Sequence, residues 1–376
     1  MAFYVNDSVF CDIYLNDVQL SLSLGNVQNL NITENIYSIL PALRLVIEDS
    51  RNSFGSGMLN AGSKISIKVG NNQDTAARKT YDFIVQGVPE HMENQAVKTY
   101  RIYGVLDKLK YQKCMEPFFY TGTSANALKA LCKQCNLKYD GVYTFDEMTW
   151  CNGTKDYASF AQNVINHGYV DRNSCMVGLV TLDGKLLYRN VNNLFPKYTF
   201  SNSKTVLQDS FVFLSMDEKN NSGLYNLEYG YKNQLSQYGY EDNHLIDSLT
   251  VTKFGSNVFN LSKTLLDDVG YVRNKIINPD IGNYHKNWAQ AEYQNLRNRA
   301  LFSLQEEFTF YGQIGLDLLQ KVNISYTDPQ SKQTDTSKPS ECVLIGKTLA
   351  ITNGQYYEKY TGVSTGTNNS LFGNLV

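Results

Sequence analysis

The stretch Tyr100-Arg101-Ile102-Tyr103-Gly104-Val105 has a counterpart near the other end of the chain, Glu358-Lys359-Tyr360-Thr361-Gly362-Val363. A turn precedes each of them, Glu93-Asn94-Gln95 in the first case and Thr352-Asn353-Gly354-Gln355 in the second. A turn signal followed by a run that contains aromatic and β-branched residues is typical of the returning strand of a β-hairpin. The chain therefore carries two hairpins with the same pattern.

The similarity extends to the residues before these hairpins. Phe83-Ile84-Val85-Gln86-Gly87 corresponds to Val343-Leu344-Ile345-Gly346-Lys347. Residues 59–67 correspond to residues 314–326, where an apolar approach and a lysine lead into an alternating strand. Each piece alone would fit any hairpin, but the pieces recur in the same order at similar spacing. We therefore predict two copies of one β-domain.

Further strand patterns fill the space around the repeats. Ile65-Ser66-Ile67-Lys68-Val69-Gly70 alternates apolar and polar residues, which indicates a half-buried strand. Residues 43–47, 81–88 and 98–105 are also strand-like, and the pattern resumes after Phe200 through residues 224–231. Closely spaced strands with turn signals between them predict a barrel or a sandwich.

The middle of the chain has a different character. Residues 124–135 have helical apolar spacing with Ser124 as N-cap, and residues 156–167 form a second helix that ends at Gly168. Residues 176–189 read as two strands around Asp183-Gly184, which predicts a hairpin with a type I′ turn. We therefore predict a small α+β insertion between the two β-domains.

The predicted fold class is mainly β with an α+β insertion. The expected division is a first β-barrel domain at 1–106, the insertion at 107–197, a second β-barrel domain at 198–364 with a helix near 284–301, and a flexible tail at 365–376. The polar segment 327–340 is bracketed by Pro329 and Pro339 and reads as a loop that is exposed or ordered by a partner.

The amino-acid composition argues against general nucleic-acid binding and favours contacts with other proteins. The 376 residues include 34 Lys and Arg against 36 Asp and Glu, a net charge of −2, with 42% hydrophobic and 19% charged residues. A near-neutral chain has no strong positive field with which to bind nucleic acid generally. The 27 tyrosines favour extended contacts with other proteins, because tyrosine combines a large apolar area with a polar tip.

The sequence shows neither a signal for secretion nor a segment for membrane insertion. The first residues, Met1 to Asp7, lack the basic and apolar regions of a secretory signal peptide. No window approaches the eighteen consecutive apolar residues of a transmembrane helix, so we expect no membrane insertion. Seven scattered cysteines are an odd number and predict reduced thiols from a cytosolic folding environment.

Metal and redox chemistry have little support in the sequence. Cys132-Lys133-Gln134-Cys135 is a lone CxxC, whereas a structural zinc site needs four ligands. Cys114, Cys151 and His167 could complete such a site only if the fold happened to bring them there. At helical spacing, two buried core cysteines are the favoured interpretation.

Other catalytic patterns are equally weak. The four histidines, His91, His167, His244 and His285, are isolated, and the acidic pairs Asp267-Asp268 and Glu306-Glu307 read as solvated side chains rather than glycosidase acids. No HExxH, phosphate-loop or dinucleotide motif is present, and Trp288 reads as part of a helix stripe. We predict that the chain is not an enzyme and has no catalytic, cofactor-binding or metal-binding residues. A cell-wall hydrolase stays a third possibility.

The order of these features resembles the baseplate hub, or tail-tube initiator, proteins of contractile-tailed bacteriophages and the N-terminal part of type VI secretion spike proteins. The resemblance spans most of the chain and rests on diffuse patterning. Its cues are the strand ending at Asp49-Ser50, residues 59–69, 83–88 and 100–106, the Ser124-Ala125-Asn126-Ala127-Leu128 start of the insertion, the Asp183-Gly184 hairpin, and the late helix leading into Gly315, Leu318, Val322 and Tyr360.

The resemblance implies two tail-tube-like barrels per chain and a homotrimer that adapts a threefold spike to a sixfold tail tube. Implied partners are the tail-tube protein, a separate central spike protein, other baseplate proteins, and DNA that passes through the lumen without specific binding. The implied location is the virion baseplate, after assembly in the host cytoplasm. A DNA channel should lack rows of Lys and Arg, because phosphate contacts would trap the DNA. The alternative is a receptor- or glycan-binding tail protein, which would show an exposed aromatic groove.

Overall fold

A computed structural model describes residues 3–6, 9–22, 26–49, 59–70, 78–87, 90–94, 97–171, 174–191, 211–215, 224–231, 248–253, 257–262, 274–277, 285, 291, 304–311, 315–325 and 341–364. The predicted loop at 327–340 and tail at 365–376 lie outside the described residues. The same holds for the predicted helix at 284–301, apart from His285 and Ala291.

The first part of the chain is a set of strands, as predicted. They are β1 (Phe3–Asn6), β2 (Val9–Leu15), β3 (Val18–Gln19), β4 (Val27–Asn35), β5 (Ala42–Asp49), β6 (Lys64–Gly70), β7 (Lys79–Val85), β8 (Glu90–Asn94) and β9 (Val97–Leu106). The predicted strands at 43–47, 65–70 and 98–105 lie within β5, β6 and β9. The predicted strand at 81–88 stops early, because Gly87 adopts a φ of +73° that a continuous strand does not allow.

An α+β segment follows this first set of strands. It contains α1 (Leu109–Lys113), β10 (Phe119–Gly122), α2 (Ser124–Gln134), β11 (Lys138–Gly141), β12 (Met148–Cys151), α3 (Tyr157–His167), β13 (Met176–Val180) and β14 (Lys185–Asn190). The helix α3 is capped by Asp156, which accepts a hydrogen bond from the Ser159 amide at 2.8 Å. The helix α2 is capped by Thr123, not Ser124 as predicted. Ser124 is instead the first helical residue, and its hydroxyl donates to the buried Asp146 at 2.6 Å.

The hairpin between β13 and β14 has a different turn from the one predicted. A type I′ turn needs a positive φ at both central residues, but only Gly184 has one, at +66°. The Gly184 amide donates to the Thr181 carbonyl, and the Thr181 amide donates to the Lys185 carbonyl. The connection is therefore a three-residue loop closed by a left-handed glycine.

Gly168 ends α3 as predicted, but it does not have the left-handed conformation that often favours glycine at a helix end. Its φ is −64°, which any residue can adopt. A side chain at this position would instead collide with the Tyr188 hydroxyl. Close packing, and not backbone conformation, is what requires glycine there.

The remaining strands form the second set. They are β15 (Phe211–Ser215), β16 (Leu224–Tyr231), β17 (Ser248–Lys253), β18 (Asn257–Ser262), β19 (Asn274–Ile277), β20 (Leu304–Tyr311), β21 (Lys321–Ser325), β22 (Glu341–Thr352) and β23 (Gln355–Ser364). The predicted strand at 224–231 coincides with β16. Strands β17, β18 and β19 form a small separate sheet, and the rest join the main sheet.

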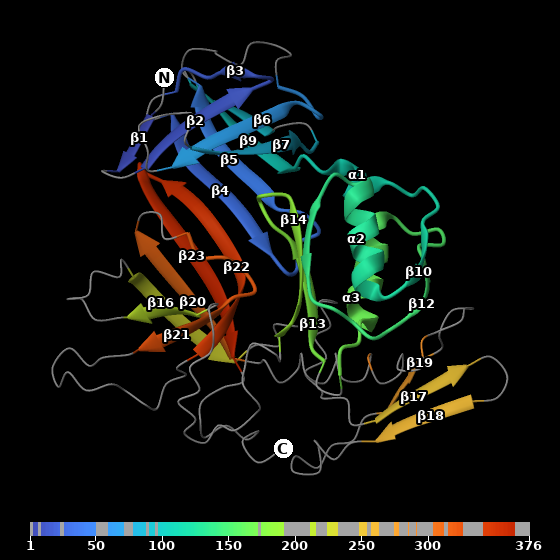
Figure 1. The fold of residues 1–376 in the computed structure, drawn as a ribbon. Helices are drawn as coiled ribbons and strands as arrows, with labels where there is room; N and C mark the ends of the chain where they lie inside the picture. The colour runs from blue at the N-terminus through green and yellow to red at the C-terminus, as the bar shows by residue number, and fades with distance from the viewer. Residues whose placement is uncertain are drawn as a thin grey trace, which may run out of the picture.

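Apart from β17, β18 and β19, the two strand sets belong to one continuous sheet. Its order is β1-β2-β6-β7-β9-β5-β4-β22-β23-β20-β16, with β3, β8, β15 and β21 paired at the sides. Figure 1 shows β4 in blue next to β22 and β23 in red, where the two sets meet. The predicted fold class, mainly β with an α+β insertion, is confirmed, and the structure adds that the two sets are joined edge to edge by β4 and β22.

The predicted repeat is visible in the strand order. The first set pairs in the order β2-β6-β7-β9-β5-β4, and the second pairs in the order β15-β21-β22-β23-β20-β16. Both sets also use these strands in the same sequence along the chain. The one difference is that β2 runs antiparallel to β6, whereas β15 runs parallel to β21.

Two local details repeat as well. The pairing of β4 with β5 shifts register between Val27 and Asn29, and the pairing of β16 with β20 shifts between Leu224 and Asn226. Gly104 in β9 and Gly362 in β23 also share a role. A Cβ at Gly104 would press on Phe83, and one at Gly362 would collide with Cys342.

Two apolar cores support this sheet. The first lies under β2, β4, β5, β6, β7 and β9 and continues into the helices α2 and α3, and it also includes Leu349, Ile351 and Tyr356 of the second set. The second lies under β20, β22 and β23 and includes Cys175 and Val177 of the insertion. The first core therefore joins residues of both strand sets, and the second joins the second strand set to the insertion.

Candidate functional site: the junction of the two strand sets

The junction is the antiparallel pairing of β4 with β22, in which Asn29 lies opposite Thr352 and Asn35 lies opposite Gly346. Side chains alternate between the two faces of these strands, and Leu30, Ile32, Leu349 and Ile351 point into the core. The other face, which we call the open face, carries Asn29, Asn31, Thr33 and Asn35 from β4 and Gly346, Thr348, Ala350 and Thr352 from β22. None of these eight residues is charged, and Thr33 and Thr348 lie 3.1 Å apart through their Oγ1 atoms.

The open face continues onto the neighbouring strands with few and scattered charges. The residues of β5 that lie on the open face include Arg44 and Glu48, and those of β9 include Arg101. On β23, Lys359 is paired with Glu307 of β20 at 2.6 Å between Nζ and Oε2. Within the described residues of these strands, the open face therefore has no row of basic residues.

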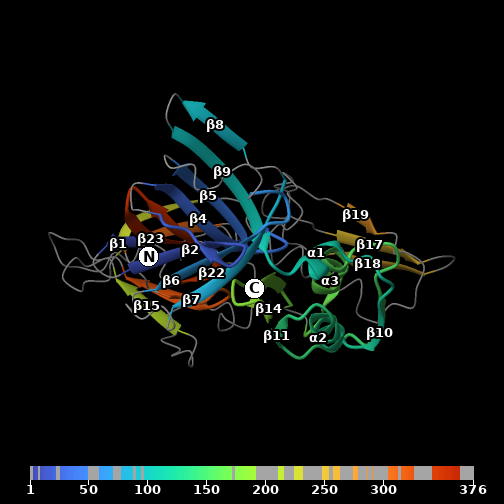
Figure 2. The same cartoon turned by 90° about the horizontal axis from the view of Figure 1, so that it is seen from above.

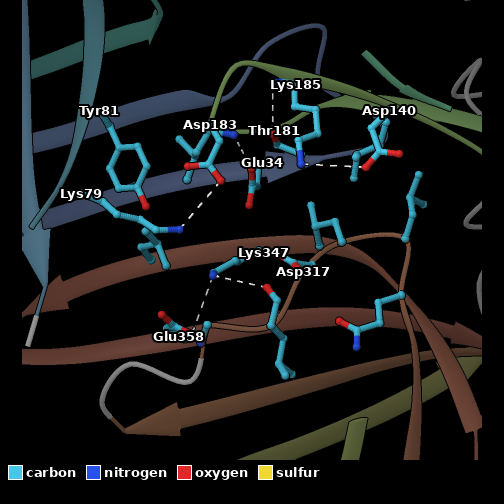
Figure 3. A pocket seen from close by; sticks show the side chains of 18 of the residues that line it. Glu34, Lys79, Tyr81, Asp140, Thr181, Asp183, Lys185, Asp317, Lys347 and Glu358 are labelled. Carbon is cyan, nitrogen blue, oxygen red and sulfur yellow. Dashed lines mark hydrogen bonds and ion pairs between the residues drawn. The ribbon is translucent and has the colours of Figure 1, made fainter. Parts of the chain in front are cut away.

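The core side of the junction is polar at one point, where the insertion meets the sheet. Glu34 extends from β4 into the interior and is 7% exposed. Its Oε2 accepts a hydrogen bond from the Leu182 amide, at the tip of the β13–β14 hairpin, at 2.6 Å. Figure 3 shows the hairpin tip above Glu34, with Asp183 facing Lys79 of β7 at 3.8 Å. The insertion is thus attached to the first strand set by a buried carboxylate.

Glu358 makes a corresponding attachment in the second strand set. It is 1% exposed and accepts hydrogen bonds from the Gly315 amide at 2.8 Å, from the Tyr356 hydroxyl at 3.0 Å, and from the Tyr360 hydroxyl. Lys347 lies 3.9 Å from the same carboxylate and is the residue opposite Glu34 in the pairing of β22 with β4. Lys347 therefore contacts Glu358 within its own strand set and lies opposite Glu34 across the junction.

These residues line a cavity of about 330 Å³ between the hairpin, β7, β22 and β23. Most of its charged residues are paired with each other: Lys79 with Asp183, Lys185 with Asp140, and Lys347 with Glu358. Tyr81, the aromatic side chain labelled in Figure 3, is 7% exposed and offers no open stacking surface. The arrangement is suited to holding three parts of the chain together, not to acid–base chemistry.

Burial has a measurable electrostatic effect on Glu34. It raises the pKa of the Glu34 carboxyl to about 7, and this outweighs the opposing effects of the Leu182 amide and of Lys347. Between the ordinary carboxyl pKa of 4.5 and about 7, the folded protein holds a proton at Glu34 that the unfolded chain has lost. The stability of the fold therefore decreases as the pH rises through this window, and levels off above it.

We predict that Glu34→Gln removes this pH dependence. The amide keeps an acceptor for the Leu182 amide but does not titrate. Between pH 5 and pH 8 the wild type should lose on the order of 3 kcal/mol of unfolding free energy relative to the variant. Urea unfolding at the two pH values measures the difference. Glu48→Gln, on the open face, is the control and should follow the wild type. An equal loss in Glu34→Gln and in the wild type would contradict the prediction.

The cysteines that could have formed a metal site lie in different surroundings, two in the core and the others nearer the surface. Cys132 and Cys135 lie on α2, 1% and 3% exposed, and burial raises the pKa of each thiol to about 12. Cys151 is exposed on β12, and Cys114 lies just after α1. Among the described residues, no three His, Cys, Asp or Glu side chains gather closely enough to hold a metal ion.

The histidines and acidic pairs do not converge on a site. The His167 Nδ1 lies 2.8 Å from the Asn163 carbonyl, and the His285 Nε2 lies 3.1 Å from the His167 carbonyl. Burial lowers the pKa of His285. Glu307 is paired with Lys359. His91 is placed on β8, and His244, Trp288 and the Asp267-Asp268 pair lie outside the described residues.

Sequence reasoning missed the two buried carboxylates of the junction. The signal that could have revealed them is their position in the strand, where every second side chain points inward. Glu34 follows Leu30 and Ile32 on the inward face of its strand, and Glu358 lies between the inward residues Tyr356 and Tyr360. A charged residue at an inward position is rarely buried unless it has partners.

The insertion carries the most exposed of the large apolar side chains in the described residues. They include Met115, Phe119, Tyr143 and Phe145, with Tyr143 89% exposed. Phe119 lies on β10, whose pairing with β12 places it opposite the exposed Cys151. Where such side chains form a patch they mark surfaces that meet other molecules, whereas single ones are common on any protein. No helix in the described part of the chain has the length and apolar character needed to cross a membrane.

The fold is that of phage tail proteins. The chain is similar to the 43 kDa tail protein of prophage MuSo2 from Shewanella oneidensis, with 11% identity, a TM-score of 0.61, and coverage of 95% of this chain and 99% of that one. It is also similar to a tail protein from Neisseria meningitidis MC58, with 9% identity, a TM-score of 0.57, and coverage of 95% and 97%.

A weaker likeness, with a TM-score of 0.48 and 8% identity, joins the chain to the E. coli c3393 protein, a component of the type VI secretion system, over 93% of this chain and 76% of that one. No protein-family model matches the sequence, and no curated protein matches it. The predicted resemblance to phage tail proteins is confirmed at the level of the fold.

Proposed function

We propose that the chain is a structural protein of a phage tail baseplate, a trimeric hub from which the tail tube starts. One observation carries the proposal: two copies of one strand set are joined edge to edge, by β4 and β22, in a single continuous sheet. Three chains would supply six such sets, which is the number needed to match a threefold spike to a sixfold tube. In this assembly the segments 1–106 and 198–364 act as tube-like domains and 107–197 as the domain inserted between them.

The open face is the proposed wall of the DNA channel. The eight junction residues of this face are small or polar and uncharged, and the basic residues beside them are scattered. Phosphate groups bind proteins mainly through Lys and Arg, so such a wall lets DNA pass without holding it. This proposal also explains why a DNA-handling protein can have a net charge of −2.

The tail-tube protein, a separate central spike protein and other baseplate proteins are the proposed partners. The exposed Phe119, Tyr143 and Phe145 suit the insertion to contacts with baseplate neighbours. The chain performs no catalysis in this role, and it belongs to the virion after assembly in the host cytoplasm.

The oligomeric state and its symmetry test the proposal. Sedimentation of the purified chain should give three times the mass of one chain, and class averages of negatively stained particles should show a ring with threefold or pseudo-sixfold symmetry. A protein that stays monomeric at high concentration would refute the hub.

A receptor- or glycan-binding tail protein is the second candidate, and the exposed aromatic residues of the insertion favour it. It predicts binding on a glycan array that is lost in Tyr143→Ala. A hub gives no signal on that array with or without the substitution.

A further inference from the structure

Several strands of the main sheet, β8 and β16 among them, have one hydrogen-bonding edge that is unpaired within the described residues. Within the described residues, β8 pairs with β9 alone, and β16 pairs with β20 alone. Figure 2 shows the β8–β9 hairpin projecting beyond the rest of the sheet. A free edge leaves backbone donors and acceptors available to another strand, and soluble proteins usually cover such edges.

The repeat relates these two free edges to the two strands of the junction. The bulge after Val27 in β4 recurs after Leu224 in β16, so Asn29 corresponds to Asn226 and Asn31 to Glu228. In the same way, β16 at the end of the second set is the counterpart of β4 at the end of the first.

The hairpins supply the second correspondence. Asn94 and Val97 close the β8–β9 hairpin, and Thr352 and Gln355 close the β22–β23 hairpin, each around a two-residue turn. Aligning the two turns makes β8 the counterpart of the end of β22, whereas the start of this 12-residue strand corresponds to β7. The strands that pair inside the chain, β4 and β22, thus have counterparts, β16 and β8, that are both free.

We propose that β16 of one protomer pairs antiparallel with β8 of the next copy of the chain, in the register of the junction. In the junction, Thr352 lies opposite Asn29 and Ala350 lies opposite Asn31. Replacing each residue by its counterpart in the repeat places Asn94 opposite Asn226 and Met92 opposite Glu228. This rests on the proposed trimer, in which three such pairings would close the ring.

The proposed register is compatible with the charges of the two strands, which disfavour one neighbouring register. It places Glu90 opposite Gly230 and Glu93 opposite Leu227, so no two acidic residues face each other. A slip of two residues in one direction would place Glu90 opposite Glu228, and like charges directly opposite destabilise a sheet. A slip of one residue would exchange the two faces of the strand.

Engineered disulfides test the register. Residues directly opposite in an antiparallel pair have Cα atoms about 4.5–5.5 Å apart, within the range of a disulfide. In a Cys151→Ser background, which removes the exposed thiol, Met92→Cys with Glu228→Cys should form covalent dimers and trimers under mild oxidation, seen on non-reducing denaturing gels. Met92→Cys with Asn226→Cys is the control, two residues out of register. Neither that pair nor either single variant should be linked.

The outcomes separate the register from the hub. Sedimentation before oxidation reports the trimer independently of the disulfide. A trimer that links the control pair, or links neither pair, overturns the register and leaves the hub intact. A monomer overturns both.

Discussion

Asp12→Ala should lower the free energy of unfolding by about 3–5 kcal/mol, because it removes the carboxylate that forms an ion pair with a buried arginine. Asp12 and Arg78 are both 1% exposed at their side chains, and Oδ2 and Nη1 lie 2.6 Å apart. Gln19 donates to the other carboxylate oxygen at 3.0 Å. The pair connects β2 to the residue that precedes β7. Urea unfolding monitored by tyrosine fluorescence gives the value.

The control is Asp17→Ala. Asp17 also pairs with a basic residue, Lys64, but at 3.9 Å and with a side chain that is 84% exposed. Exposed pairs contribute about 0–1 kcal/mol, and alanine at the left-handed φ of Asp17, +67°, costs about 1–2 kcal/mol. This variant should therefore lose less stability than Asp12→Ala. Asp12→Leu combined with Arg78→Met should be less destabilised than Asp12→Ala alone, since no buried charge is left over. If Asp12→Ala and Asp17→Ala lower the free energy of unfolding equally, the buried ion pair does not stabilise the fold more than the exposed one.

Lysines at the junction should convert the proposed channel wall into a DNA-binding surface. Thr33→Lys with Thr348→Lys places two lysines per chain on the open face, where the native threonines lie opposite each other. A trimer would carry six. Six phosphate contacts make affinity fall by about 10³-fold between 50 and 200 mM salt. Fluorescence anisotropy with a short DNA duplex should therefore show strong binding at low salt for the variant and none for the wild type.

The chain provides a matched control for this experiment. Thr121 and Thr149 are also opposite each other, with their Oγ1 atoms 3.0 Å apart, but they lie on the β10–β12 ribbon of the insertion. Thr121→Lys with Thr149→Lys adds the same charge outside the proposed channel. If this variant binds the duplex as tightly, net charge explains the effect and the open face is not a channel wall.

Several elements of the fold were predictable because their signals are local. The strands at 65–70 and 224–231 follow from alternation of apolar and polar residues, which a half-buried strand imposes at every second position. The helices α2 and α3 follow from apolar spacing and a capping residue within one turn. The repeat was also readable, since both copies need glycine at the same crowded position, Gly104 and Gly362.

Other features depended on contacts that local patterns do not encode. Asp-Gly suits both a type I′ turn and a three-residue loop that ends in glycine, so the sequence at Asp183-Gly184 left the choice open. In the structure, Leu182 is buried and its amide is held by Glu34, a residue 148 positions away. The cap of α2 moved by one residue for a similar reason, because the Ser124 hydroxyl is engaged by Asp146.

By itself, the sequence determined the strands, the two helices of the insertion and the existence of two related strand sets, because side-chain periodicity acts over a few residues. Only the tertiary structure decided that β4 and β22 join those sets into one sheet. Thr33 and Thr348 meet across 315 positions of sequence, and backbone hydrogen bonds between strands are the same for any partner. The choice of partner came from the buried faces, where Leu30 and Ile32 meet Leu349 and Ile351 in one core, with Glu34 and Lys347 opposite each other beside them.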